Sequence, residues 1–278
     1  MALKVSKTKE IIKHAAILFV LIFAFFPLYL MFVVSFKDND QFTNNPWYFD
    51  ALGSWHWANW AKAWMTISNY IANSIVTSVG AVAFCLVMAT LTAYVLARYK
   101  FPGKNIIYYG LIGSMFLPGA ITTLVTMFML LRSLHLINSL WALIITGAVG
   151  GQVVCVFILK QFIEDIPKEL FESAQLDGAG HLQQIWNIVL PMSGSILSTL
   201  AILQFIASWN NLMLPLIIMR DDQLLTIPVG LMRLDGEYVK QWGELMAGYT
   251  LSAIPLVILF LFTMRLFVKG LTAGAIKG

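Results

Sequence analysis

The residue types best suited to bind another protein are gathered in one polar stretch, residues 164–191, which reads EDIPKELFESAQLDGAGHLQQIWNIVLP. Long apolar segments precede and follow this stretch. Its carboxylates, which include Glu169, Glu172 and Asp177, could form ion pairs and charge-assisted hydrogen bonds with a partner protein. An exposed acidic helix is often only a solvated surface, so the charges by themselves leave both interpretations open.

Local sequence signals indicate the elements that hold these carboxylates. Pro167 suits the first position of a helix because its missing N–H would be unpaired there, and the helix dipole favours the acidic residues that follow. Gly178 permits a backbone turn that residues with a β-carbon resist. A second run, 181–190, has a helical pattern until Pro191. We therefore predict a short amphipathic helix, a sharp turn and a second helix, which together form a rigid projection suited to docking.

Other kinds of chemistry have little support in the sequence. The four histidines are His14, His56, His135 and His181. No two of them have the spacing of metal ligands, and no Ser, His and Asp residues converge as in a hydrolase. Cys85 and Cys155 lie in apolar segments and show neither a disulfide framework nor a metal spacing. No Gly-x-x-x-x-Gly-Lys-Ser/Thr loop occurs, so we expect neither an enzyme nor a nucleotide site in this chain.

The composition indicates an integral membrane protein. Of 278 residues, 59% are hydrophobic and 12% are charged, whereas soluble domains have roughly 45–50% and about 25%. No polar segment is long enough to form a soluble domain, so residues 1–278 are predicted to be a single membrane domain. The net charge of +4 does not indicate nucleic acid, because the basic residues lie at the ends of apolar segments, where membrane topology explains them.

Six segments are predicted to span the bilayer, since a spanning helix needs about 20 largely apolar residues. They are 14–36, 70–97, 106–131, 140–160, 192–219 and 245–267. An even number places both termini on one side. With the N-terminus inside, twelve of the 18 Lys and Arg residues are cytoplasmic, so the positive-inside rule predicts cytoplasmic termini and a cytoplasmic 164–191 stretch.

Particular residues carry a resemblance to a known family. The run 172–180, ESAQLDGAG, followed by IVLP at 188–191, resembles the EAA motif in membrane subunits of binding-protein-dependent ABC importers. Ser173 stands where that motif usually has alanine. The turn 97–104 and the closing stretch 270–278 are similar to the carbohydrate-importing, maltose-permease-like branch. Together these features extend the resemblance over almost the whole chain.

The resemblance implies an all-α, type I ABC importer permease in a bacterial plasma membrane, with the 164–191 stretch as a coupling loop. Its expected partners are a second homologous permease subunit, two cytoplasmic ATPase subunits that bind ATP and Mg, an extracytoplasmic solute-binding protein and a carbohydrate substrate. The chain itself would hold no cofactor. The residues expected to dock on the ATPase are Glu169, Leu170, Phe171, Glu172, Ala174, Asp177, Gly178 and Ala179.

Polar side chains within the predicted spans are candidates for the substrate pathway: Asn73, Thr77, Thr126, Trp209, Asn210 and Asn211. Such residues also hold membrane helices together by hydrogen bonds, which is the alternative interpretation. In the outer loop 220–244, the resemblance makes Asp235, Gly236, Glu237 and Tyr238 the expected contact for the solute-binding protein.

A self-contained, ion-coupled secondary transporter is the alternative function. Proton-driven carriers usually hold ionisable residues within the membrane. The central parts of all six predicted spans lack Asp, Glu, Lys, Arg and His. This argues against proton coupling but leaves sodium coupling open, because hydroxyls and carbonyls can bind sodium.

Overall fold

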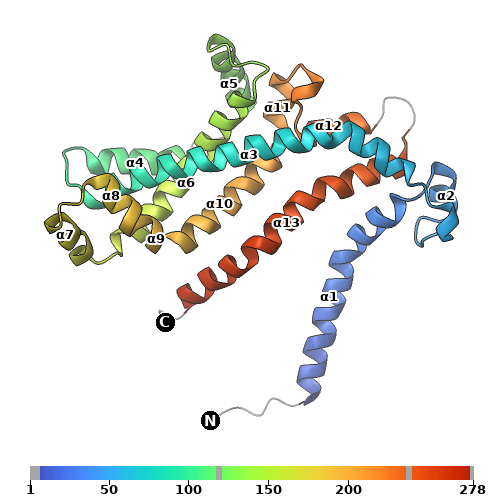
Figure 1. Cartoon of the computed structure of the whole chain (residues 1–278), viewed down its shortest axis with the longest axis horizontal. Coiled ribbons are helices and arrows are strands. Elements are labelled where there is room, and N and C mark those ends of the chain that lie inside the picture. The colour runs from blue at the N-terminus through green and yellow to red at the C-terminus, as the bar shows by residue number, and fades with distance from the viewer. Residues whose placement is uncertain (1–6, 117–120, 236–239, 276–278) are drawn as a thin grey trace. The chain divides into compact units, whose positions relative to one another are not determined.

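The computed structural model describes residues 7–116, 121–235 and 240–275, and every element in that part of the chain is helical (Figure 1). The long helices are α1 (Lys7–Val34), α3 (Ala58–Arg98), α6 (Leu140–Glu164), α10 (Gly194–Trp209) and α13 (Trp242–Ala275). The shorter helices are α2 (Asn39–Asn44), α4 (Lys104–Ser114), α5 (Ile121–Ser133), α7 (Lys168–Leu176), α8 (His181–Gln184), α9 (Leu190–Met192), α11 (Met213–Ile218) and α12 (Ile227–Leu234). Three further segments are η1 (Leu52–Ser54), η2 (Ile185–Val189) and η3 (Asp222–Leu224). The predicted all-α class is confirmed.

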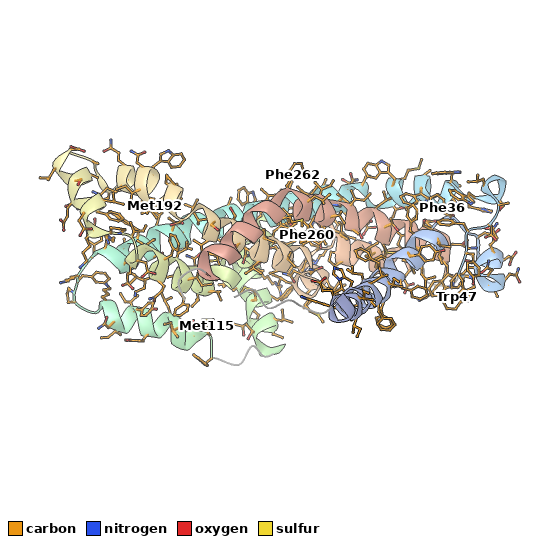
Figure 2. The ribbon with its side chains drawn as sticks, turned by 90° about the horizontal axis from the view of Figure 1, so that it is seen from below. Phe36, Trp47, Met115, Met192, Phe260 and Phe262 are labelled. Carbon is orange, nitrogen blue, oxygen red and sulfur yellow. The ribbon has the colours of Figure 1, made fainter. Side chains whose placement is uncertain are left out.

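Among the described residues, five helical stretches are long and apolar enough to cross a membrane: Glu10–Val34, Ala58–Arg98, Leu140–Glu164, Gly194–Ile218 and Trp242–Met264. Each overlaps one of the predicted spans. Large apolar side chains project from them without cover from this chain, for example Phe260 and Phe262 on α13, which are 60% and 79% exposed (Figure 2). Such exposure suits helices that meet lipid or other membrane helices.

The remaining predicted span, 106–131, is not one continuous helix in the described residues. Two shorter helices, α4 and α5, lie at its two ends, and residues 117–120 between them fall outside the described part of the chain. Pro118 and Gly119 occur in this interval. Proline cannot donate a backbone hydrogen bond and glycine is a poor helix former.

The chain divides into two compact units, one formed by residues 1–68 and 231–254, the other by residues 69–230 and 255–278. In the first unit, the ring of Phe36, which Figure 2 labels, has the rings of Trp55, Trp57 and Trp60 around it, with centroids 4.7, 5.0 and 5.3 Å away. These tryptophans lie in the segment between α1 and α3 and at the start of α3. They therefore serve at least in part to pack this unit.

The core of the second unit joins α3, α6 and α10 with the 164–191 loop. Small residues on α3 and α6, including Ala89, Ala93 and Ala148, are fully buried, which permits close approach of the two helices. Cys85 on α3 and Cys155 on α6 face each other as free thiols with sulfur atoms 3.7 Å apart. They are packing residues, as predicted from their apolar surroundings.

The contact between α6 and α10 depends on a glycine. A β-carbon at Gly151 would overlap the side-chain amide of Gln204. The Gln204 amide donates a hydrogen bond to the carbonyl of Gly147, at 2.7 Å. Gly151 thus makes room for a buried polar side chain that crosses between the two helices.

Candidate functional site

The first half of the 164–191 loop is the helix α7, which ends in a sharp turn. Pro167 caps its N-terminal end. Gly178 has φ +81°, a left-handed conformation that residues with side chains rarely adopt. The N–H of Ala179 donates to the carbonyl of Ala174 at 2.8 Å, and the N–H of Gly178 to that of Gln175 at 3.0 Å. This pair of bonds is a Schellman motif, so the predicted helix and turn are both present.

The second half of the loop is helical, with a change of register. It consists of α8, the π-helical turn η2 and α9. In η2 the N–H of Leu190 bonds to the carbonyl of Ile185, five residues back. The helix was predicted to stop at Pro191, but α9 continues to Met192. The wider π-helical turn lets the chain accommodate Pro191, which cannot donate a backbone hydrogen bond and whose ring crowds the preceding turn.

The two faces of α7 have different environments. Phe171 is buried, at 3% exposure, against the core of the second unit. Glu169, Glu172, Asp177 and Gly178 are exposed, as is Leu170 at 43%, while Ala174 and Ala179 are half-buried. Of the eight residues predicted to dock, Phe171 alone is directed into the chain itself. The exposed face therefore combines carboxylates with apolar side chains.

Sequence reasoning missed three apolar side chains on the surface of this loop. Leu176, Leu182 and Trp186 are 90%, 75% and 72% exposed. Leu176 is the last residue of α7, five positions after the buried Phe171, and so lies on a different face of the helix. This offset from Phe171 was the available signal. Large apolar groups exposed on a polar loop are typical of a binding surface.

The loop is tied to the end of α3 by aromatic and polar contacts. The guanidinium of Arg98, the last residue of α3, lies 3.6 Å from the ring centroid of Phe171. The Tyr94 hydroxyl donates to Gln184 Oε1 at 2.8 Å. Gln184 in turn donates to the carbonyl of Ala179 at 3.1 Å. Arg98 and Tyr94 thus hold α7 and α8 respectively, a role that their sequence positions did not reveal.

One further polar contact attaches the loop to the end of α3. The Tyr99 hydroxyl lies 2.6 Å from Nδ1 of His181, at the start of α8. On the α6 side the attachment is apolar, since Leu159 and Ile163 are in the same buried core as Ile166 and Phe171. The loop therefore packs against both α3 and α6.

The predicted pathway residues do not form one lining surface. Thr77 and Asn211 share a cavity of about 10 Å³, which accommodates about one water molecule and no sugar. Asn73 donates to the carbonyls of Gln223 and Leu225, at 2.7 and 3.0 Å, and so ties α3 to the segment before α12.

The other three pathway candidates lie apart from that cavity. Trp209 is buried, with its ring stacked on that of Phe205 at 5.5 Å. Asn210, at the C-terminal end of α10, and Thr126, on α5, are exposed. In this single chain only Thr77 and Asn211 of the six side chains share a cavity, and the role of the six in a pathway stays a prediction.

The predicted contact for the solute-binding protein is only partly described. Asp235 forms an ion pair with Lys240, with 2.9 Å between carboxylate oxygen and Nζ. Gly236, Glu237 and Tyr238 lie outside the described residues. This part of the prediction is therefore open.

Residues 86–273 match the family model described as "Binding-protein-dependent transport system inner membrane component". The probable ABC transporter permease protein YurM of Bacillus subtilis is 35% identical over 254 residues, which cover 91% of this chain and 84% of the relative. The arabinooligosaccharides transport system permease protein AraQ of Halalkalibacterium halodurans is 31% identical over 94% of each chain. The trehalose/maltose transport system permease protein MalG of Thermococcus litoralis is 30% identical over 97% and 98%.

A solved structure has the same fold. It is a chain from a bacterial ABC transporter involved in the import of the acidic polysaccharide alginate. The two chains superpose with a TM-score of 0.82, and the match covers 95% of this chain and 98% of the other, at 16% sequence identity. The agreement in fold therefore extends over nearly the whole chain.

Proposed function

Because this chain belongs to the family of binding-protein-dependent transport system inner membrane components, we propose that the 164–191 loop couples it to a separate ATPase. The chain is a transmembrane subunit of an ABC importer for a carbohydrate, and it is a multi-pass protein of the inner membrane. Its family implies ATPase and solute-binding protein partners.

One observation carries the coupling proposal: α7 exposes a mixed acidic and apolar face while its opposite face is fixed to the core. Glu169, Glu172, Leu170 and Leu176 are on the exposed side. Phe171 is held on the inner side under Arg98. A surface of this kind can bind a partner and pass its movement to α3, because packed helices move as rigid bodies rather than deforming continuously.

The substrate class follows from the relatives. The arabinooligosaccharide and trehalose/maltose permeases are similar to this chain over more than nine-tenths of its length. We therefore assign it an oligosaccharide or a related sugar. Polar side chains such as Asn210 and Asn211 would contribute to the pathway only when a second permease subunit completes it.

The assembly that we propose contains two permease subunits, two cytoplasmic ATPase subunits and one extracytoplasmic solute-binding protein. ATP and Mg would be bound by the ATPases. Both termini of this chain would be cytoplasmic, which places α7 on the ATPase side. The outer loop around Asp235 would meet the solute-binding protein. ATP binding would close the ATPases, move α7 and switch the pathway from inward-facing to outward-facing.

Reconstitution of the purified complex in proteoliposomes tests this function. We expect uptake of a labelled oligosaccharide to require ATP, with Mg, on the side that carries α7, together with the solute-binding protein on the other side. Uptake that survives removal of ATP but is lost when the sodium gradient is dissipated would establish the secondary transporter instead. The complex without its solute-binding protein is the matched control.

A further inference from the structure

A basic cavity of about 360 Å³ lies beside the coupling loop and is lined by the end of α3, the α3–α4 turn, α7 and α8. Figure 1 shows these elements close together. Four cationic side chains line it: Arg98 from α3, Lys100 from the turn, Lys104 from α4 and Lys168 from α7. One carboxylate, that of Glu172, is also present. Elements distant in sequence thus bring four positive charges to one cavity, where they outnumber the single carboxylate.

The lysines of this basic cavity have no internal counter-ion. In the part of the chain that the structure describes, no carboxylate forms an ion pair with Lys100, Lys104 or Lys168. By contrast Lys160, one turn before the end of α6, is paired with Glu164. Unpaired cations that converge on a cavity attract an anion from outside the chain.

An apolar groove lies along the preceding turns of α3, next to the basic cavity. Val87, Leu91, Tyr94 and Arg98 succeed one another at spacings of four, three and four, so they lie on one face of the helix. Val87 and Leu91 line a groove of about 670 Å³, whereas Tyr94 and Arg98 line the basic cavity. Leu182, Trp186 and Leu197 form other parts of the groove. Charged at one end and apolar at the other, this surface has the polarity of a phospholipid.

We propose that the basic cavity binds the phosphate-bearing headgroup of an anionic phospholipid, with an acyl chain in the apolar groove. The cavity lies where the spanning helix α3 ends, at the expected cytoplasmic surface. Headgroups lie at the same depth, and basic pockets between membrane helices on that side bind anionic lipids. Arg98 and Tyr94 also hold the coupling loop, so the lipid would contact the region that joins α7 to α3.

Native mass spectrometry of the assembled transporter tests the headgroup. The complex is extracted from nanodiscs of phosphatidylcholine with a minor fraction of phosphatidylglycerol. We expect the native chain to retain phosphatidylglycerol selectively and the triple variant Lys100→Gln, Lys104→Gln and Lys168→Gln to lose it by at least about tenfold, since each lysine near a bilayer contributes roughly fivefold. Lys13→Gln on α1, an exposed lysine outside the cavity, is the control and should change nothing.

A second arm separates a lipid from a free phosphate. Phosphatidylglycerol with brominated acyl chains should quench Trp186, measured as the difference in fluorescence between the native and Trp186→Phe complexes, and the lysine triple variant should lose this difference. Displacement of the retained lipid by millimolar inorganic phosphate or glycerophosphoglycerol would overturn the assignment to a lipid. Equal quenching by brominated phosphatidylcholine would overturn it as well. A triple variant that keeps its lipid but loses the ATPase would show that the cavity faces the ATPase instead.

Discussion

The guanidinium of Arg98 lies 3.6 Å from the ring centroid of Phe171, and this contact joins the end of α3 to the inner face of α7. Phe171 is buried while its neighbours Leu170 and Glu172 are exposed. A movement imposed on the outer face of α7 therefore has a direct route to a spanning helix. The first prediction concerns this contact.

Replacement of Arg98 by Gln should impair coupling more than assembly. A partly exposed cation–π contact contributes about 0.5–1 kcal/mol, and about 2 kcal/mol when desolvated, so we expect transport per ATP hydrolysed to fall severalfold while the ATPase stays bound. Arg98→Lys keeps the charge and should recover part of the loss. Simultaneous measurement of uptake and ATPase activity in proteoliposomes checks the ratio. An unchanged ratio in Arg98→Gln would remove this contact from the coupling route.

The turn after α7 should not tolerate a β-branched residue. Gly178 has φ +81° and no atom lies within 4 Å of an added β-carbon, so the penalty for Val there comes from the backbone conformation rather than from crowding. The left-handed conformation costs roughly 1–2 kcal/mol per residue. We expect Gly178→Val to shift α8 relative to α7 and to uncouple uptake from ATP hydrolysis.

Gly180 supplies the matched control for that variant. It has φ −70°, an ordinary conformation, and its added β-carbon would meet only Gln183 Oε1, at 4.0 Å. Gly180→Ala should therefore transport as the native chain does. If both variants transport normally, the left-handed turn has no part in coupling.

Reversal of charge at Glu172 should weaken docking without unfolding the loop. The carboxylate is exposed on α7, and the inner face of the helix is held independently by Phe171. We expect Glu172→Lys to reduce co-purification of the ATPase, and Glu172→Gln to have an intermediate effect because it removes charge without reversing it. Thermal unfolding of the two variants should match that of the native chain. Full ATPase recovery with the lysine variant would show that Glu172 takes no part in docking.

The packing of α6 on α10 gives a prediction about stability. An added β-carbon at Gly151 would overlap Gln204, whose buried amide would then lose its bond to Gly147. A buried polar group left without a partner costs about 1–3 kcal/mol, so Gly151→Ala should lower the Tm of the detergent-solubilised chain. At Gly150 no atom lies within 4 Å of an added β-carbon, and Gly150→Ala should leave the Tm unchanged.

The amphipathic helix, its turn and its second helix could be predicted because each depends on residues close in sequence. Pro167 and Gly178 mark the start of α7 and the turn by local backbone chemistry alone. The attachment of the loop could not be predicted, since Arg98 meets Phe171 across 73 positions of the chain. The 106–131 segment was predicted as one span, and its described residues form two helices, α4 and α5.

The most direct test of the central claim is a cross-link from the exposed end of α7. The variant Leu176→Cys, at a side chain that is 90% exposed, is treated with a bifunctional thiol reagent in the native complex. The native Cys85 and Cys155 are buried and should not react. Leu134→Cys, 57% exposed on the expected outer side, is the control. We predict a product that joins this chain to the ATPase from position 176 and none from position 134. An equal yield at both positions, or none at 176, would contradict a coupling role for the 164–191 loop.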